Sequence, residues 1–137
     1  MRLVLDTNVV VTAFRSRGGA SAELLRQIRR GRARLLATVP LFLEYEAVLS
    51  RPDHLAGLSG KDIGVALDAL ASFVEPVEPF FLWRPQLRDA DDDMVLEAAV
   101  NGRADALVTY NLRDFAAATR FGLYVAKPLT ILERLLQ

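Results

Sequence analysis

The chain contains no cysteine and a single histidine among its 137 residues. Without cysteine, the sequence cannot form disulfides, thiolate metal sites or a thiol nucleophile. The one histidine, His54, lies in a Pro-Asp-His segment typical of a solvated turn, so any mechanism that needs a histidine base would rest on this residue alone. The sequence instead offers carboxylates as its chemically active groups.

The sequence also lacks a net charge and a long hydrophobic run. Apolar residues make up 52% of the chain, yet no stretch approaches the roughly 18 uncharged apolar residues of a membrane span, and no signal-peptide pattern opens the sequence. We therefore expect a cytoplasmic protein with no membrane partner. The balance of 17 Lys plus Arg against 17 Asp plus Glu argues against nucleic-acid binding through a strongly basic tail.

Positive charge is nevertheless concentrated in one place. Five arginines crowd the end of one expected helix and the turn after it: Arg26, Arg29, Arg30, Arg32 and Arg34. They fit a solvated face that complements a helix C-terminus, and they fit equally well a patch that follows nucleic-acid phosphates. The sequence leaves both interpretations open.

The order of apolar and amphipathic segments predicts one α/β domain over residues 1–137. No repeat, low-complexity tract or Gly/Ser linker interrupts the chain, and its length suits one sizeable core. Strands are expected at residues 2–6 and 35–38, within 74–83, and at 106–109 and 122–126. Helices are expected at residues 7–14, 21–30, 40–50, 60–73, 92–101, 111–119 and 128–136.

Several of these strands are continuous apolar runs, which is typical of a parallel sheet covered on both faces. Pro76 and Pro79 interrupt the third strand region, which predicts a short edge strand there. The expected fold class is a three-layer α/β/α domain with a central parallel sheet of about four to five strands. Because ligands collect beyond the carboxyl ends of such strands, polar residues at those ends are the candidate functional residues.

Carboxylates follow the first strand and interrupt the third expected helix. Asp6 ends the first strand, although Asp-Thr-Asn is also an ordinary helix cap. Glu44 and Glu46 both break an otherwise apolar helix, and helical periodicity does not choose between them.

A run of aspartates at positions 89, 91, 92 and 93 precedes another helix. Capping and the attraction of a helix N-terminus for negative charge explain part of this run. Asp93 shares a helical stripe with Leu96 and Val100, so it should lean inward, where an unpaired carboxylate is costly. A metal ion is one way to neutralise it.

The last candidate segment, TYNLRDF, follows the strand at 106–109. Asn111 and Asp114 have the spacing of a capping box, but together with Thr109 they also fall at the carboxyl end of a strand. Two to four carboxylates without histidine or cysteine suit Mg²⁺ or Mn²⁺ and suit zinc poorly. On phosphodiesters, such ions generate hydroxide from bound water and stabilise the developing charge.

Four segments together resemble the PIN-domain nucleases, in particular the VapC-like toxins of bacterial toxin–antitoxin systems. VLDTNVVVTAF, LFLEYEAVLSRP, RDADDDMVLEAA and ALVTYNLRDF stand in the family's order and approximate spacing, and the likeness covers essentially the whole chain. By position, the resemblance implies four catalytic metal ligands, Asp6, Glu44, Asp93 and Asp114, with Asn8, Thr109 and Asn111 in support.

One position departs from the family pattern. Many relatives have aspartate where Asn111 stands, so the fourth role stays open between this amide and Asp114. The resemblance further implies an endoribonuclease that uses Mg²⁺ or Mn²⁺ to cleave RNA, a homodimer and a cognate antitoxin.

Two alternatives are retained. A receiver-like phosphoacceptor domain shares the α/β alternation, the acidic strand end at Asp6 and a Lys127-Pro128 pair after the last strand, but it needs adjacent acids after the first strand and an aspartate that ends the third. A catalytically silent PIN fold acting as a binding module is disfavoured because the principal carboxylates are retained.

Overall fold

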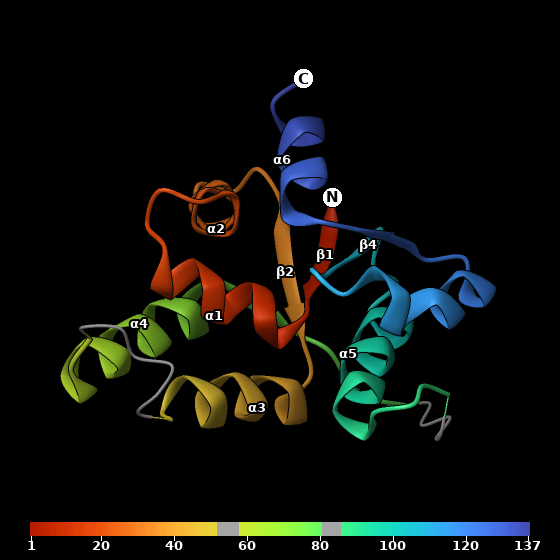
Figure 1. The fold of residues 1–137 in the computed structure, drawn as a ribbon, viewed down its shortest axis with the longest axis horizontal. Coiled ribbons are helices and arrows are strands. Elements are labelled where there is room, and N and C mark those ends of the chain that lie inside the picture. The colour runs from red at the N-terminus through yellow and green to blue at the C-terminus, as the bar shows by residue number, and fades with distance from the viewer. Residues whose placement is uncertain (52–57, 81–85) are drawn as a thin grey trace.

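The computed structural model describes residues 1–51, 58–80 and 86–137 (Figure 1). His54 and the end of the expected 74–83 strand region lie outside these residues. The elements, in chain order, are β1 (Arg2–Leu5), α1 (Thr7–Arg15), α2 (Ala20–Arg29), β2 (Arg34–Ala37), α3 (Val39–Leu49), α4 (Gly60–Phe73), β3 (Val74–Pro76), α5 (Ala90–Asn101), β4 (Ala106–Val108), the 3-10 helix η2 (Leu112–Phe121), β5 (Tyr124–Ala126) and α6 (Pro128–Leu135).

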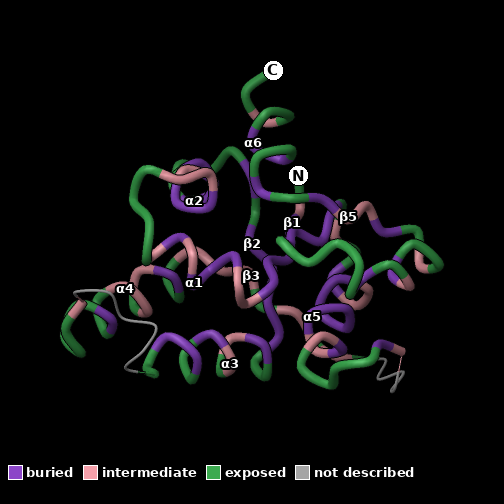
Figure 2. The backbone as a smooth tube through the Cα atoms, viewed as in Figure 1, coloured by how far each residue is buried: buried purple, intermediate pink, exposed green. Residues whose placement is uncertain are grey.

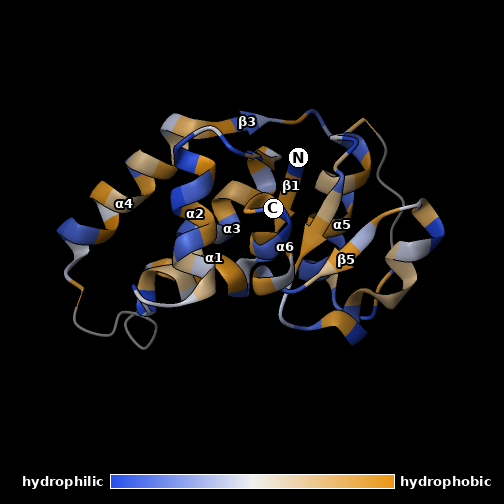
Figure 3. Cartoon of the chain, turned by 90° about the horizontal axis from the view of Figure 1, so that it is seen from above, coloured by the Kyte–Doolittle hydropathy of each residue, from blue (hydrophilic) through white to orange (hydrophobic). Residues whose placement is uncertain are grey.

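The strands form a five-stranded sheet in the order β3-β2-β1-β4-β5, and every pair is parallel. This confirms the α/β fold class, with β3 as an edge strand. Figures 1 and 3 show α1 and α2 on one side of the sheet and α5 on the other, while α3 lies beyond the carboxyl end of β2. Because all strands run the same way, the residues that follow them meet at one edge of the sheet.

Continuous apolar strands explain why the centre of the sheet is covered on both faces. All of β4 is buried, and in β1 only Arg2 retains partial exposure (Figure 2). The hydroxyl of Tyr45, on α3, donates a hydrogen bond to the carbonyl of Leu5 at the end of β1. Burial raises the pKa of Tyr45 well above its usual value, so the hydroxyl stays protonated and fixes α3 against the strand end.

The C-terminal part differs in detail from the sequence prediction. The short helix expected at 111–119 is a 3-10 helix, interrupted at Phe115, where φ is −109° and ψ is 17°. The last strand begins at Tyr124 rather than at residue 122, because Gly122 has a left-handed φ of 74° that ends η2.

None of the helices in the described residues is both long and apolar enough to cross a membrane.

Two glycines provide a matched test of this packing. At Gly102, a Cβ would stand 2.8 Å from the Ala98 carbonyl oxygen and 3.0 Å from side-chain carbons of Leu36 and Val77. Gly102→Ala should therefore lower the free energy of unfolding by about 1–3 kcal/mol. Gly64→Ala, within α4 and with nothing within 4 Å of the added carbon, should raise it by about 0.5–1 kcal/mol. Chemical denaturation of both variants measures the difference, and a stabilised Gly102→Ala protein would contradict the packing described.

Candidate functional site

The pairing of β1 with β4 places Asp6 next to Thr109 at the carboxyl edge of the sheet. The backbone N–H of Asp6 donates to the Val108 carbonyl over 2.8 Å, and the N–H of Thr109 donates to the Ala126 carbonyl over 3.0 Å. The Thr109 hydroxyl then donates to Oδ2 of Asp6 over 2.7 Å. Both residues are buried, so the sheet itself orients this carboxylate.

Asp6 does not act as an ordinary helix cap. It occupies the N-cap position of α1, but its side chain makes no capping hydrogen bond with the first turn. Burial raises the pKa of the Asp6 carboxyl, partly offset by the hydrogen bond from Thr109 and by the N–H of Thr7, and the charges of Asp114 and Asp89 raise it further. The carboxylate is therefore positioned for something other than capping.

Asp92 belongs to the same group of carboxylates, although the sequence analysis did not select it. Burial raises the pKa of Asp92 from 3.8 to about 7, and the charges of Asp6, Asp89, Asp114 and Asp91 add to the shift. A carboxyl with this pKa holds its proton until about neutral pH, because burial disfavours its charged form and its neighbours repel a further negative charge. The centre therefore favours a proton or another cation.

Asp93 faces inward as expected, but its partners are backbone groups. Its Oδ1 accepts hydrogen bonds from the N–H groups of Gln86 and Leu87, over 3.2 and 3.0 Å. These bonds compensate its burial without a metal ion. Asp93 thus holds the segment that leads into α5, and its role as a metal ligand stays a prediction, while Asp92 is an aspartate on which the charge of Asp6 acts.

The sequence contained a signal for Asp92 that was not decisive. Asp92 precedes the buried residues Val95 and Ala99 by three and seven positions, the same spacing that relates Asp93 to Leu96 and Val100. Each of these two adjacent aspartates thus lies in line with an apolar stripe along the helix. Only the packing of α5 against the sheet distinguishes them.

The two glutamates of α3 are separated clearly. Burial raises the pKa of Glu44, the charges of Asp91 and Asp89 raise it further, and the nearby Arg51 partly opposes this effect. Glu46 is exposed to solvent. Glu44 is therefore the glutamate that faces the aspartates, on the side of Asp89 and Asp91.

The segment after β4 delivers Asp114 to the group. The N–H of Asn111 donates to the Thr109 hydroxyl oxygen over 3.0 Å, and the N–H of Asp114 donates to the Asn111 carbonyl over 3.0 Å. The Asn111 side chain makes no capping hydrogen bond, so the capping-box interpretation is wrong here. Thr109 thus orients Asp6 through its hydroxyl proton and the following turn through its hydroxyl oxygen.

Asn8 adds an oxygen without a partner. Within the described residues, its Oδ1 is the one buried side-chain polar atom that has no hydrogen bond. An unpaired buried acceptor is costly and often marks the place of a water or an ion that the side chain would otherwise bind. Asn8 lies in the first turn of α1, two residues after Asp6.

The donor set fits a hard divalent cation. No three His, Cys, Asp or Glu side chains in the described residues lie close enough together to hold an ion by themselves. Mg²⁺ commonly binds through one or two carboxylates and completes its shell with water, so such a direct cage is not required.

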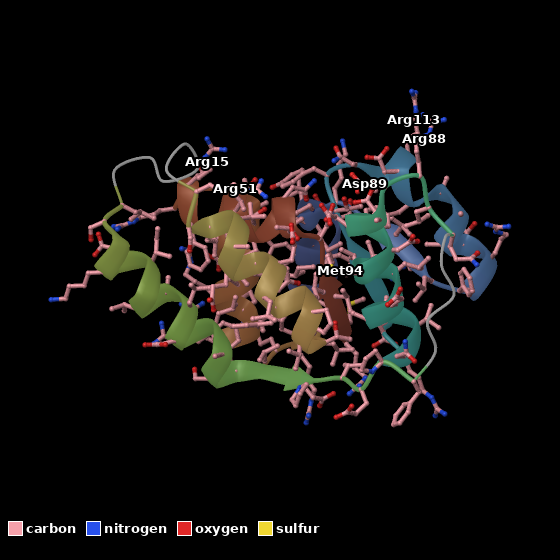
Figure 4. All side chains as sticks on the ribbon, turned by 90° about the horizontal axis from the view of Figure 1, so that it is seen from below. Arg15, Arg51, Arg88, Asp89, Met94 and Arg113 are labelled. Carbon is pink, nitrogen blue, oxygen red and sulfur yellow. The ribbon has the colours of Figure 1, made fainter. Side chains whose placement is uncertain are left out.

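Figure 4 shows Asp89 at the end of α5 that faces this edge, among the carboxyl groups that we call the acidic centre. Its members are Asp6, Glu44, Asp89, Asp91, Asp92 and Asp114.

Neutralising Asp92 should stabilise the metal-free protein at neutral pH. Because the folded-state pKa of about 7 exceeds the unfolded value of 3.8, the stability due to the bound proton is complete below about pH 4 and is lost as the pH rises through 7. Allowing for solvent screening of this half-exposed group, Asp92→Asn should raise Tm in EDTA at pH 8 by about 4 °C, or about 1 kcal/mol, and less at pH 5.

The neighbouring aspartate is the matched control. Asp93→Ala leaves the N–H groups of Gln86 and Leu87 without their acceptor, so it should lower the free energy of unfolding by about 1–3 kcal/mol at both pH values. Thermal melts of the two variants in EDTA separate the roles. A destabilised Asp92→Asn protein, or an unaffected Asp93→Ala protein, would contradict this assignment.

Comparison with known proteins gives matches of two kinds, in structure and in sequence. The chain is similar in structure to "VapBC2 from Rickettsia felis bound to a DNA fragment from their promoter", with a TM-score of 0.64 and 18% sequence identity over 91% of this chain and 97% of that chain. At this identity the likeness concerns the fold. No curated protein sequence matches the chain significantly.

The sequence itself matches a family profile described as the PIN domain, over residues 2–113. The matched segment includes β1, α3, α5 and β4, the elements that bring Asp6, Glu44, Asp92 and Thr109 to the acidic centre. The chain belongs to the PIN domain family.

Proposed function

We propose that this protein is a metal-dependent endoribonuclease of the cytoplasm and the toxin of a toxin–antitoxin pair. Membership of the PIN family supports nuclease chemistry. The observation that carries the proposal is the buried Asp6 carboxylate, oriented by Thr109 and surrounded by further carboxylates whose mutual repulsion favours a bound cation.

The residues that would hold the ion are Asp6, Glu44, Asp92 and Asp114, with Asn8 and Asn111 in support. Asp92 replaces the Asp93 of the sequence-based assignment, because Asp93 is already engaged by two backbone N–H groups. When bound, Mg²⁺ or Mn²⁺ supplies a hydroxide from coordinated water and stabilises the charge that develops on the phosphate. Thr109 donates to Oδ2 of Asp6 and so fixes the orientation in which this carboxylate would bind the ion.

Asp93 and Asp89 are positioning residues in this proposal. Asp93 accepts from Gln86 and Leu87, and Asp89 accepts from the N–H of Asp91 at the start of α5 over 2.9 Å. These three bonds fix the chain that leads into the helix. Asp92 is then held toward the sheet edge rather than left on a free loop.

The receiver-like alternative finds little support in the fold. That design needs an aspartate at the end of the third strand, whereas β3 ends at Pro76 on the outer edge of the sheet. The silent-module alternative would make the costly collection of carboxylates unnecessary, because like charges destabilise a fold unless a cation or a proton compensates them.

The toxin part of the proposal draws on the similar VapBC2 structure and on a groove in this chain. The groove, with a volume of about 660 Å³, lies between α1, α2 and α4. Phe14, Leu25 and Leu70 are among its apolar lining residues, and Arg17 and Lys61 line it as well. An antitoxin helix with an apolar face and acidic flanks would match this surface.

A homodimer remains part of the proposal. Val39 and Leu43, one turn apart on α3, expose 67% and 56% of their surface. An apolar stripe of this kind is better covered than left in water, and a second copy of α3 would cover it.

RNA cleavage should require a divalent ion. The purified protein should cut single-stranded or structured RNA with Mg²⁺ or Mn²⁺ and should stop in excess EDTA. Asp6→Asn, Asp92→Asn and Glu44→Gln should each slow cleavage roughly 100-fold or more, because each removes one carboxylate from the ion. Glu46→Gln, on the exposed face of the same helix, should cleave like wild type. Gel analysis of labelled RNA measures these rates, and undiminished cleavage in EDTA would contradict the proposal.

The toxin role makes a separate prediction in cells. Expression of the wild-type protein in a bacterial host should arrest growth, whereas expression of Asp6→Asn should not, because the arrest depends on cleavage. Co-expression of a short DNA-binding protein encoded by the adjacent gene should restore growth and should co-purify with the chain. Normal growth despite active enzyme in vitro would remove the toxin part and leave the nuclease part intact.

A further inference from the structure

We propose that two pairs of arginines, Arg15 with Arg51 and Arg88 with Arg113, bind the phosphates of an RNA strand on opposite sides of the acidic centre. We call these four residues the arginine rim. The inference rests on the proposed nuclease function and identifies the residues that would position its substrate.

Within the described residues the side chains of the arginine rim lack hydrogen bonds and ion pairs, although the charge of Arg51 acts on the nearby Glu44. All four side chains are exposed. Guanidinium groups present planar sets of donors that match phosphate oxygens. Four such groups are therefore exposed to a ligand without breaking a hydrogen bond or an ion pair within the described residues.

The arginine cluster noted in the sequence is in a different state. Arg26 and Arg30 lie 2.7 and 3.9 Å from Glu23, Arg32 donates to Gln27 and Arg34 pairs with Glu75, whereas Arg29 makes no hydrogen bond or ion pair within the described residues. Arg34 begins β2 and pairs with Arg2 at the start of β1, so this end of the cluster lies at the amino edge of the sheet, opposite Asp6. This geometry favours the solvated-face interpretation of the cluster.

The arginine rim, in contrast, flanks the carboxyl edge. Figure 4 shows Arg15 and Arg51 toward one side, Arg88 and Arg113 toward the other, and Asp89 between them. Figure 1 agrees for the first pair, because α1 and α3 run in the same direction and pack together, so that Arg15 and Arg51 stand at their common C-terminal side.

Chain connectivity ties the second pair to the carboxylates. Arg88 directly precedes Asp89, the N-cap of α5, and Arg113 directly precedes Asp114 in η2. α5 and η2 pack against each other. A strand that touches both pairs would cross the acidic centre, and the guanidiniums would offset the repulsion between its phosphates and the carboxylates.

The test is RNA binding measured without cleavage. A fluorescent single-stranded RNA is titrated in EDTA at several salt concentrations with wild type, with Arg15→Gln/Arg51→Gln and with Arg88→Gln/Arg113→Gln. Each rim double variant should bind about tenfold more weakly, and its log–log salt slope should fall by about 1.4, because each single-strand phosphate contact contributes about 0.7. The corresponding Arg→Lys doubles should restore most of the slope, because they keep the charge.

The control double variant is Arg29→Gln/Arg30→Gln, from the sequence-based cluster, and it should bind RNA like wild type. All variants should melt like wild type, since the substituted side chains are exposed. In steady-state cleavage with Mg²⁺, the rim variants should show a raised KM and a nearly unchanged kcat, because these arginines position RNA and do not contact the ion.

The outcomes separate this inference from the proposed function. An unchanged salt slope in either rim double, or an equal loss in the Arg29/Arg30 control, overturns the inference. If wild type cleaves RNA while the rim variants bind normally, the inference fails and the nuclease stands. If RNA binding depends on the rim but no cleavage occurs with any divalent ion, the nuclease proposal fails and the arginine rim stands as a nucleic-acid surface.

Discussion

The parallel pairing of β1 with β4 is the constraint on which the rest of the site depends. It brings Asp6 to within hydrogen-bond distance of Thr109, 103 residues later in the chain, and both residues lie at strand ends that the sheet cannot easily shift. A slip of one residue would turn each buried apolar side chain of these strands toward the other face. The orientation of the Asp6 carboxylate is therefore supported by the packing of the whole core, and its raised pKa is the electrostatic consequence of that burial.

The aspartate run before α5 shows how one short segment serves three physical purposes. Asp89 caps the helix, Asp93 holds the preceding backbone, and Asp92 faces the other carboxylates. The first two interactions stabilise the fold and the third opposes it. Stabilising bonds on either side of Asp92 thus hold a destabilising group in place, which is how strain at a functional site is commonly maintained.

The two edges of the sheet use charge in opposite ways. At the amino edge, Arg2 and Arg34 share the carboxylate of Glu75, and these neighbours lower its pKa, so charge is balanced within the protein. At the carboxyl edge, the carboxylates repel one another, and the arginine rim forms no hydrogen bond or ion pair with the described residues. The paired charges at the amino edge stabilise the fold. The carboxylates and arginines at the carboxyl edge can instead form favourable electrostatic interactions with ligands.

The sequence by itself determined the alternation of strands and helices, the parallel sheet and the edge at which Asp6, Thr109 and Asp114 meet, because apolar runs and their spacing report burial and because parallel strands end together. Tertiary structure showed that the charge of Asp6 acts on Asp92, that the side chains of Asp6 and Asn111 make no capping hydrogen bond, and which arginines form ion pairs within the described residues. Periodicity gives the orientation of a side chain around its own helix axis. The choice between Asp92 and Asp93, or between one arginine cluster and another, depends on how that helix is placed against groups from distant parts of the chain, and only the packed fold contains that information.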